Sequence, residues 1–190
     1  MKLLQNAIAA GVLAVMATSA SAATVNYATG FTDQNRGTIL SDPAVDAFRD
    51  DPMSATGAPD DDFYSLGLGG SVIMTFGKVF NAAAGSGVSV YEITFGNIST
   101  YPESVNVSAT LGGAVQAFLG NVSNLDAQGG NTLTFAGAFD GLLFEDTTTA
   151  DPSEDGFDLD AVGVSAVPLP ASSLLLLAGL GGLGALRRRK

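Results

Sequence analysis

The sequence contains no cysteine, no histidine and no tryptophan among its 190 residues. Without cysteine, the chain can form no disulfide, thiolate nucleophile or zinc–thiolate site. Without histidine, it lacks the usual general base near neutral pH and the commonest metal ligand. These absences exclude most hydrolase and redox mechanisms, and they leave the carboxylates as the main source of chemistry.

The charges are segregated along the chain. Five of the eight basic residues stand at the two ends, whereas all nineteen acidic residues lie between Asp33 and Asp160. Only three basic residues share that segment, so its net charge is −16. A body of this charge repels nucleic acid and anionic lipid, and we expect no nucleic-acid partner.

The N-terminus has the order of features typical of a secretory signal peptide. Lys2 precedes an apolar run from Ala7 to Ala17, and Ala20-Ser21-Ala22 matches the small-residue pattern of a signal peptidase site. The sequence therefore predicts a signal peptide over residues 1–22 that signal peptidase removes after Ala22, so that the mature chain is exported. The alternative is an N-terminal helix buried in the fold.

The C-terminus carries a short apolar segment from Ala171 to Leu186 that contains no charge. As a helix it would be about 24 Å long, which is marginal for a hydrocarbon core of about 30 Å. The four basic residues that follow would stay on the cytoplasmic side of the membrane. Two prolines before the segment hold the chain extended, which is a conformation that a protease can bind.

This C-terminal pattern resembles the PEP-CTERM protein-sorting signal in its VPLPA variant, over residues 167–190. The resemblance implies a Gram-negative bacterium that makes extracellular polysaccharide. It also implies recognition by an exosortase, a membrane-embedded cysteine protease that removes the tail. The protein would then reside briefly in the inner membrane and afterwards at the cell surface or outside the cell. A permanent single-span anchor is the alternative. The sorting motif itself consists of Val167, Pro168, Leu169, Pro170 and Ala171.

The body, residues 23–166, has the texture of an all-β domain, because short runs of strand-forming residues alternate with turn residues. We predict an antiparallel β-sandwich of the jelly-roll type, with one short helix near Asp42–Asp51. The segment Gly67–Gly70 is interpreted as a bulged strand entry, since it lacks the Lys-Ser/Thr ending of a phosphate loop. The predicted strands are Thr24–Tyr27, Ser71–Phe76, Val88–Phe95, Ser104–Thr110, Ala114–Leu119, Thr132–Phe135, Gly141–Phe144 and Phe157–Val164.

The body also resembles a family of secreted bacterial β-sandwich domains, often found on PEP-CTERM proteins. This resemblance implies a jelly roll of the galactose-binding type. One departure is the stretch after Ser108, where relatives usually carry a polar Asp-Gly turn and an aromatic residue. The segments that carry the resemblance are Gly57–Phe76, Val90–Glu92, Glu103–Ser108 and Gly156–Val162.

Acidic residues near the end of the body suggest a bound cation. On a strand, Asp158 and Asp160 would share one face about 6.6 Å apart. Phe157 and Leu159 would face the core on the other side. Neighbouring carboxylates repel each other unless a cation or hydrogen bonds intervene, and Ca²⁺ takes six to eight oxygens in irregular geometry. The sequence therefore predicts a structural calcium site, with candidate ligands Asp60, Asp62, Glu92, Asp158 and Asp160.

The alternative to calcium is a hydrated acidic loop around Asp151 to Asp155, with Glu92 paired to Lys78. No other cofactor and no catalytic residue is predicted.

Three function classes follow. The first is a non-catalytic surface or matrix protein linked to exopolysaccharide and biofilm, and the second is a calcium-assisted carbohydrate-binding module. The third, a glycoside hydrolase that uses two carboxylates, is disfavoured because aromatic sugar platforms are scarce, with no tryptophan and only four tyrosines.

Overall fold

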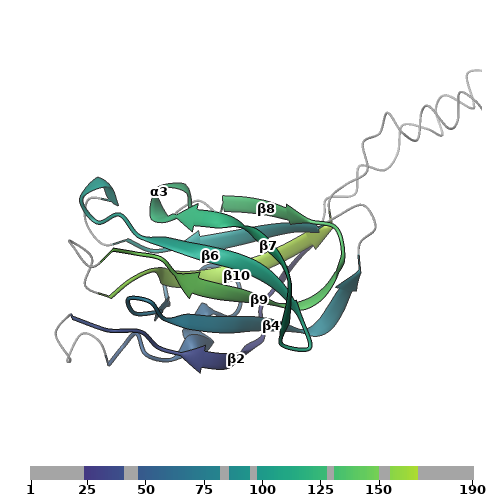
Figure 1. Cartoon of the computed structure of the whole chain (residues 1–190), viewed down its shortest axis with the longest axis horizontal. Coiled ribbons are helices and arrows are strands. Elements are labelled where there is room, and N and C mark those ends of the chain that lie inside the picture. The colour runs from purple at the N-terminus through teal and green to yellow at the C-terminus, as the bar shows by residue number, and fades with distance from the viewer. Residues whose placement is uncertain are drawn as a thin grey trace, which may run out of the picture.

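A computed structural model shows a β-sandwich of two antiparallel sheets (Figure 1). The predicted signal peptide, the predicted sorting signal and the first half of the helix predicted over Asp42–Asp51 lie outside the described residues. The structure describes residues 24–40, 47–81, 86–94, 98–127, 131–149 and 155–166.

Each sheet has five strands, and every neighbouring pair is antiparallel. The β10 sheet has the order β1-β10-β5-β8, with β3 also paired to β10. The β9 sheet has the order β2-β4-β9-β6-β7. The strands of the β10 sheet are β1 (Val25–Tyr27), β3 (Tyr64–Ser65), β5 (Ser86–Glu92), β8 (Asn131–Phe135) and β10 (Asp158–Ala166). The strands of the β9 sheet are β2 (Gly30–Asn35), β4 (Ser71–Asn81), β6 (Ser104–Leu111), β7 (Ala114–Ser123) and β9 (Ala138–Asp146).

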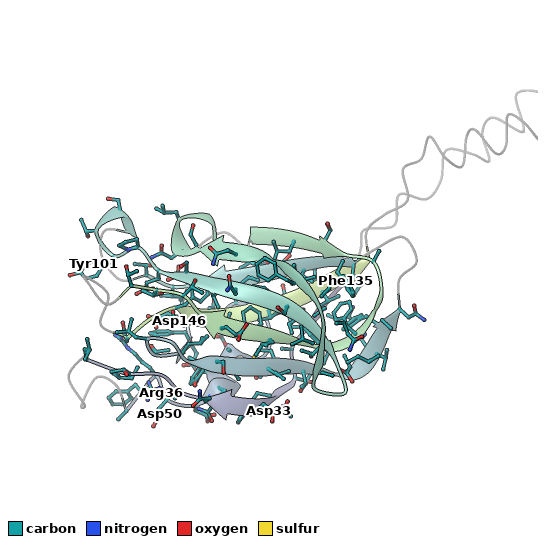
Figure 2. The ribbon with its side chains drawn as sticks, viewed as in Figure 1. Asp33, Arg36, Asp50, Tyr101, Phe135 and Asp146 are labelled. Atoms are coloured by element: carbon teal, nitrogen blue, oxygen red, sulfur yellow. The ribbon has the colours of Figure 1, made fainter. Side chains whose placement is uncertain are left out.

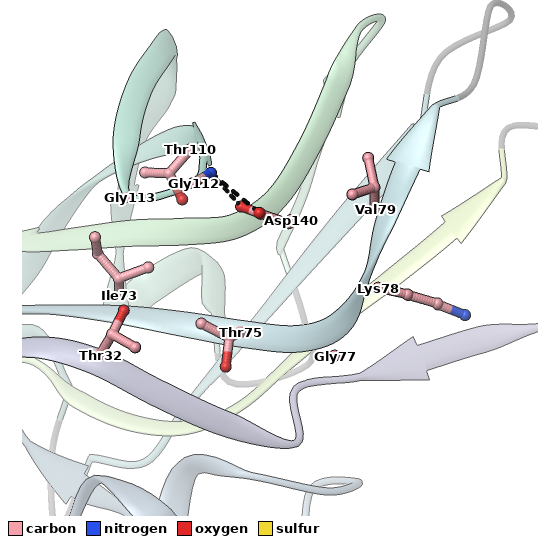
Figure 3. A pocket seen from close by; sticks show the side chains of 10 residues that line it. All are labelled: Thr32, Ile73, Thr75, Gly77, Lys78, Val79, Thr110, Gly112, Gly113 and Asp140. Carbon is pink, nitrogen blue, oxygen red and sulfur yellow. Dashed lines mark hydrogen bonds between the residues drawn. The ribbon is translucent and has the colours of Figure 1, made fainter.

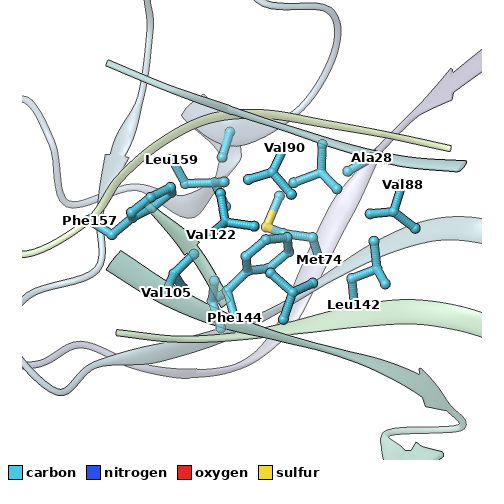
Figure 4. Packing of buried hydrophobic residues seen from close by; sticks show 14 of the residues in the cluster. Ala28, Met74, Val88, Val90, Val105, Val122, Leu142, Phe144, Phe157 and Leu159 are labelled. Atoms are coloured by element: carbon cyan, nitrogen blue, oxygen red, sulfur yellow. The ribbon is translucent and has the colours of Figure 1, made fainter. Parts of the chain in front are cut away.

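The core lies between the two sheets and follows the period of two expected of strands with one buried face (Figure 4). On β9, for example, Leu142 and Phe144 are fully buried and face the cluster. On β10 the pairing with β5 shifts between Leu159 and Ala161, so Val162 rather than Ala161 joins Leu159 in the core. The bulge thus lies at Asp160, one of the acidic residues of β10.

The eight predicted strands all form, and the structure adds two that were not predicted, β2 and β3. β2 is a polar edge strand with four consecutive exposed residues, so it carries no alternation of apolar side chains. Within the predicted helix, the described residues 47–51 form a turn and a bend rather than a helix. The short helical turns among the described residues are η1 (Pro52–Ala55), η2 (Ile98–Thr100) and α3 (Asn124–Ala127). None of the helices in the described part of the chain has the length and hydrophobicity needed to span a membrane.

Candidate functional site

The carboxylate of Asp146, which is labelled in Figure 2, joins three parts of the chain at one end of the sandwich. Asp146, the last residue of β9, is 7% exposed. It accepts backbone N–H groups from Gly69 at 2.9 Å, Thr148 at 3.2 Å and Phe157 at 3.0 Å, and the Thr148 hydroxyl at 2.7 Å. Asp146 therefore fixes the glycine-rich segment and the entry to β10 against the end of β9.

The glycine-rich segment Gly67–Gly70 forms a turn before β4 and packs against other backbone, and no bulge is present in it. A Cβ on Gly67, whose φ is +77°, would lie 2.7 Å from the backbone of Gly37, and one on Gly70 would lie 2.0 Å from the carbonyl oxygen of Leu66. The N–H groups of residues 67 to 70 all donate to acceptors within the protein. Since these donors are engaged internally, the segment offers no cradle for a phosphate.

The predicted calcium ligands divide into two neighbouring sets. Asp158 accepts a hydrogen bond from the Ser65 hydroxyl and raises the pKa of nearby Glu92. Asp160 instead accepts the backbone N–H of Asp60 at 3.2 Å, and the Asp60 carboxylate accepts the N–H of residue 62 at 3.1 Å.

The two carboxylates of β10 thus have different partners, although Phe157 and Leu159 do face the core as predicted. Within the described ranges, no group of three or more acidic residues is spaced to hold a metal ion. Calcium binding by Asp60, Asp62, Glu92, Asp158 and Asp160 stays a prediction.

Glu92 and Asp158 form a buried carboxyl cluster, together with Glu103. Their side chains are 3%, 4% and 6% exposed, respectively. Burial raises the pKa of Glu92 to about 8; the Thr94 hydroxyl opposes the rise and Asp158 adds to it. Burial also raises the pKa of Asp158 well above its ordinary value, and the negative charge of Asp155 adds to the rise. In the absence of a cation, Glu92 therefore carries a proton at neutral pH.

The alternative pairing of Glu92 with Lys78 is wrong. Lys78 lies on β4 in the β9 sheet, where its ammonium group donates to the Asn26 side chain and sits 5.1 Å from the ring centroid of Phe80. Glu92 lies on β5 in the other sheet. The hydrated-loop alternative fails for Asp155 as well, because its carboxylate forms a salt bridge with Arg49.

A cavity opens on the outer face of the β9 sheet, away from these carboxylates (Figure 3). Its volume is about 460 Å³, and its walls come from β2, β4, β9 and the turn between β6 and β7. Nothing in the sequence indicated it, because its lining residues are of mixed type, from threonines and glycines to two aliphatic and two charged residues, and are spread over four strands.

The C-terminal segment matches a known protein-sorting motif. Residues 166–190 match the family model of the PEP-CTERM protein-sorting motif. Such a motif implies an exported protein that is transiently anchored in the membrane and processed by an exosortase, a membrane protease. The resemblance of the C-terminus to the PEP-CTERM sorting signal, predicted from the sequence, is thereby confirmed.

Solved structures that resemble the body are carbohydrate-binding modules. The C-terminal family 6 module of the laminarinase LamC from Zobellia galactanivorans aligns with a TM-score of 0.42 and 10% identity, over 76% of this chain and 99% of that one. A family 35 module of Abf62 from Cellvibrio japonicus aligns with a TM-score of 0.37 and 16% identity, over 75% and 92% of the two chains. These scores are low, so the fold assignment rests on the sheets themselves and no ligand is carried over. No curated protein matches the sequence.

Proposed function

We propose that this chain is a non-catalytic protein of the cell surface or extracellular polysaccharide matrix, exported and then released from the membrane by an exosortase. The observation that carries the proposal is the PEP-CTERM motif at residues 166–190. The composition supports it, because a chain without cysteine and histidine has few routes to catalysis. The link to polysaccharide and biofilm is the part of the proposal that goes furthest beyond the motif.

The body is suited to an existence outside the cell. It folds into one sandwich around an apolar core. This core stabilises the fold without a disulfide, because the chain contains no cysteine. Its net charge of −16 keeps it soluble and hinders adsorption to anionic surfaces. We infer that the sorting signal determines where this body goes, and that the exposed faces of the sandwich determine what it contacts there.

Replacing both Pro168 and Pro170 with Ala is expected to block processing. Alanine removes the constraint that proline places on the backbone, so the protease would meet a motif free to join the helix predicted to follow it. In a host that carries the exosortase, we expect the variant to accumulate in the inner membrane with its C-terminus intact. Cell fractionation and intact-mass measurement detect that form.

Ser172→Ala with Ser173→Ala is the matched control, because these residues adjoin the motif but lie outside it. The control should be processed as the unsubstituted chain is. Normal mass and release of the proline variant would contradict the proposal and favour a motif with no role in processing.

A further inference from the structure

The cavity on the outer face of the β9 sheet forms because the turn between β6 and β7 bends over that face (Figure 3). Gly112 and Gly113 make this two-residue turn with φ of +58° and +80°, the backbone angles of a tight hairpin that favours glycine. The N–H of Gly112 donates to both carboxylate oxygens of Asp140, at 3.1 and 3.0 Å. A Cβ on Gly113 would lie 3.7 Å from the carboxylate of Asp33 on β2, so the turn reaches across the sheet.

The floor of the cavity includes Thr110 and Ile73, which pack closely over a glycine. Gly141 on β9 pairs with Thr110 on β6 and with Thr75 on β4. A Cβ on Gly141 would lie 2.7 Å from Thr110 Oγ1 and 2.9 Å from Ile73 Cγ2, so these two side chains close over the glycine. The floor thus combines a hydroxyl with an apolar surface.

The hydroxyl of Thr110 is the one polar group of this floor that needs a partner. Thr110 is fully buried, and its Oγ1 has no hydrogen-bond partner in the described part of the chain. A buried hydroxyl without a partner is destabilising, because it has lost its hydrogen bonds to water. A ligand hydroxyl at the base of the cavity would remove that penalty.

The lining indicates the chemistry of the ligand. Hydroxyls of Thr32 and Thr75 and the Asp140 carboxylate supply hydrogen-bonding groups, whereas Ile73 and Val79 supply apolar surface. A sugar ring matches this mixture, since it has a hydroxylated edge and a face of C–H groups. The volume of about 460 Å³ lies within the range of roughly 300–1,000 Å³ typical of small-molecule sites.

The charges favour a neutral sugar over an acidic one. Lys78 is the only cation of the lining, and its ammonium group donates to Asn26 outside the cavity. Asp140 lies in the wall, and Asp33 lies beside the turn. We propose that this cavity binds a neutral sugar residue. The assignment of this sugar to the polysaccharide in which the protein resides rests on the proposed function.

The test uses the full chain in a detergent without a sugar headgroup. The probes are glucose, galactose, mannose and glucuronic acid, with glycerol as the additive control, and binding is followed by ligand-observed NMR titration. We expect at least one neutral hexose to bind in the millimolar range, more tightly than glucuronic acid or glycerol. Thr110→Val keeps the shape of the side chain and removes the hydroxyl, so it should weaken that binding about tenfold.

If Thr110 had a purely structural role, Thr110→Val would lower the melting temperature and the affinity together. Because its hydroxyl has no partner in the described part of the chain, we expect instead that Thr110→Val weakens binding while the melting temperature stays unchanged or rises. Thr134→Val, at an exposed position of β8 on the other sheet, should change neither property. Thr75→Trp, which fills the cavity from its floor, should abolish binding in a chain that still folds cooperatively.

Four results would overturn the inference: no sugar binds, glycerol binds as tightly as the hexose, glucuronic acid binds more tightly, or Thr110→Val and Thr75→Trp leave the affinity unchanged. The outcome is separable from that of the sorting test. A chain that binds a hexose but is never processed contradicts the proposed function alone, and a processed chain that binds no sugar contradicts this inference alone.

Discussion

Replacing Asp146 with Asn is expected to lower the melting temperature of the protein by roughly 6–12 °C. The carboxylate accepts three backbone N–H groups and one hydroxyl. An amide has only one acceptor oxygen, and its NH₂ group would face N–H donors. The cost is about 3 kcal/mol, because the amide cannot pair with all of these donors, of which the Phe157 N–H is buried and those of Gly69 and Thr148 are part-buried. For a chain of this size, each kcal/mol shifts the melting temperature by roughly 2–4 °C.

Glu145→Gln is the matched control for this substitution. Glu145 precedes Asp146 on β9, but its side chain is exposed on the opposite face of the strand. The control should melt within about 2 °C of the unsubstituted chain, as most surface substitutions do. Thermal denaturation followed by circular dichroism measures both variants, and a similarly small change for Asp146→Asn would show that these hydrogen bonds do not hold the loops together.

Raising the pH from 5 to 9 in the presence of EDTA is expected to destabilise the protein through the buried carboxyl cluster. Burial raises the pKa of Glu92 from 4.5 to about 8 and raises the pKa of Asp158 and Asp160 as well. Between pH 4.5 and about pH 8, Glu92 binds more protons in the folded state than in the unfolded state, so the stability of the protein falls as the pH rises. The contribution is fully present below about pH 4.5 and is lost as the pH passes about 8.

Glu92→Gln separates this group from the rest of the chain. Glutamine is a neutral analogue of the protonated side chain, so the variant should lose less stability over the same pH range, by roughly 5 °C in melting temperature. Glu145→Gln again serves as the control and should follow the unsubstituted chain. Parallel pH curves for all three proteins would show that Glu92 ionises as freely as a surface carboxyl.

The same titration in millimolar calcium tests the cation predicted from the sequence. A bound Ca²⁺ would favour the ionised carboxylates, so the loss of stability with rising pH would shrink. Asp158→Asn with Asp160→Asn would then remove the response to calcium. Identical curves with calcium and with EDTA would contradict the predicted site.

Most of the fold follows from sequence patterns, and the exceptions have clear physical reasons. Strands such as β4 and β9 are recognisable because each carries a short apolar run, Val72–Met74 and Leu142–Phe144. β2 is polar because it lies at an edge of the sheet, where neither pattern nor propensity distinguishes it from a loop. β3 has only two residues, and its pairing with β10 depends on how the whole chain packs.

The sites were less predictable than the strands. Asp146 is one of seven acidic residues between Phe144 and Val162. Only the hydrogen bonds from Gly69 and Phe157 distinguish it from the exposed Glu145. Asp158 and Asp160 were expected to act together, but the bulge in β10 and their separate partners, Ser65 and Asp60, place them in different surroundings. The sorting signal was predictable because its function resides in a short linear motif that needs no fold to be recognised.

Peptide mapping of the C-terminus shows whether an exosortase removes the C-terminal tail of this exported protein. The protein would be collected from the cell surface and the medium, and its C-terminal peptide identified by mass spectrometry. The account predicts that this form lacks the basic end Arg187–Lys190, and that deletion of the exosortase restores it. Surface or released protein that still carries Arg187–Lys190 in cells with an active exosortase would contradict the account.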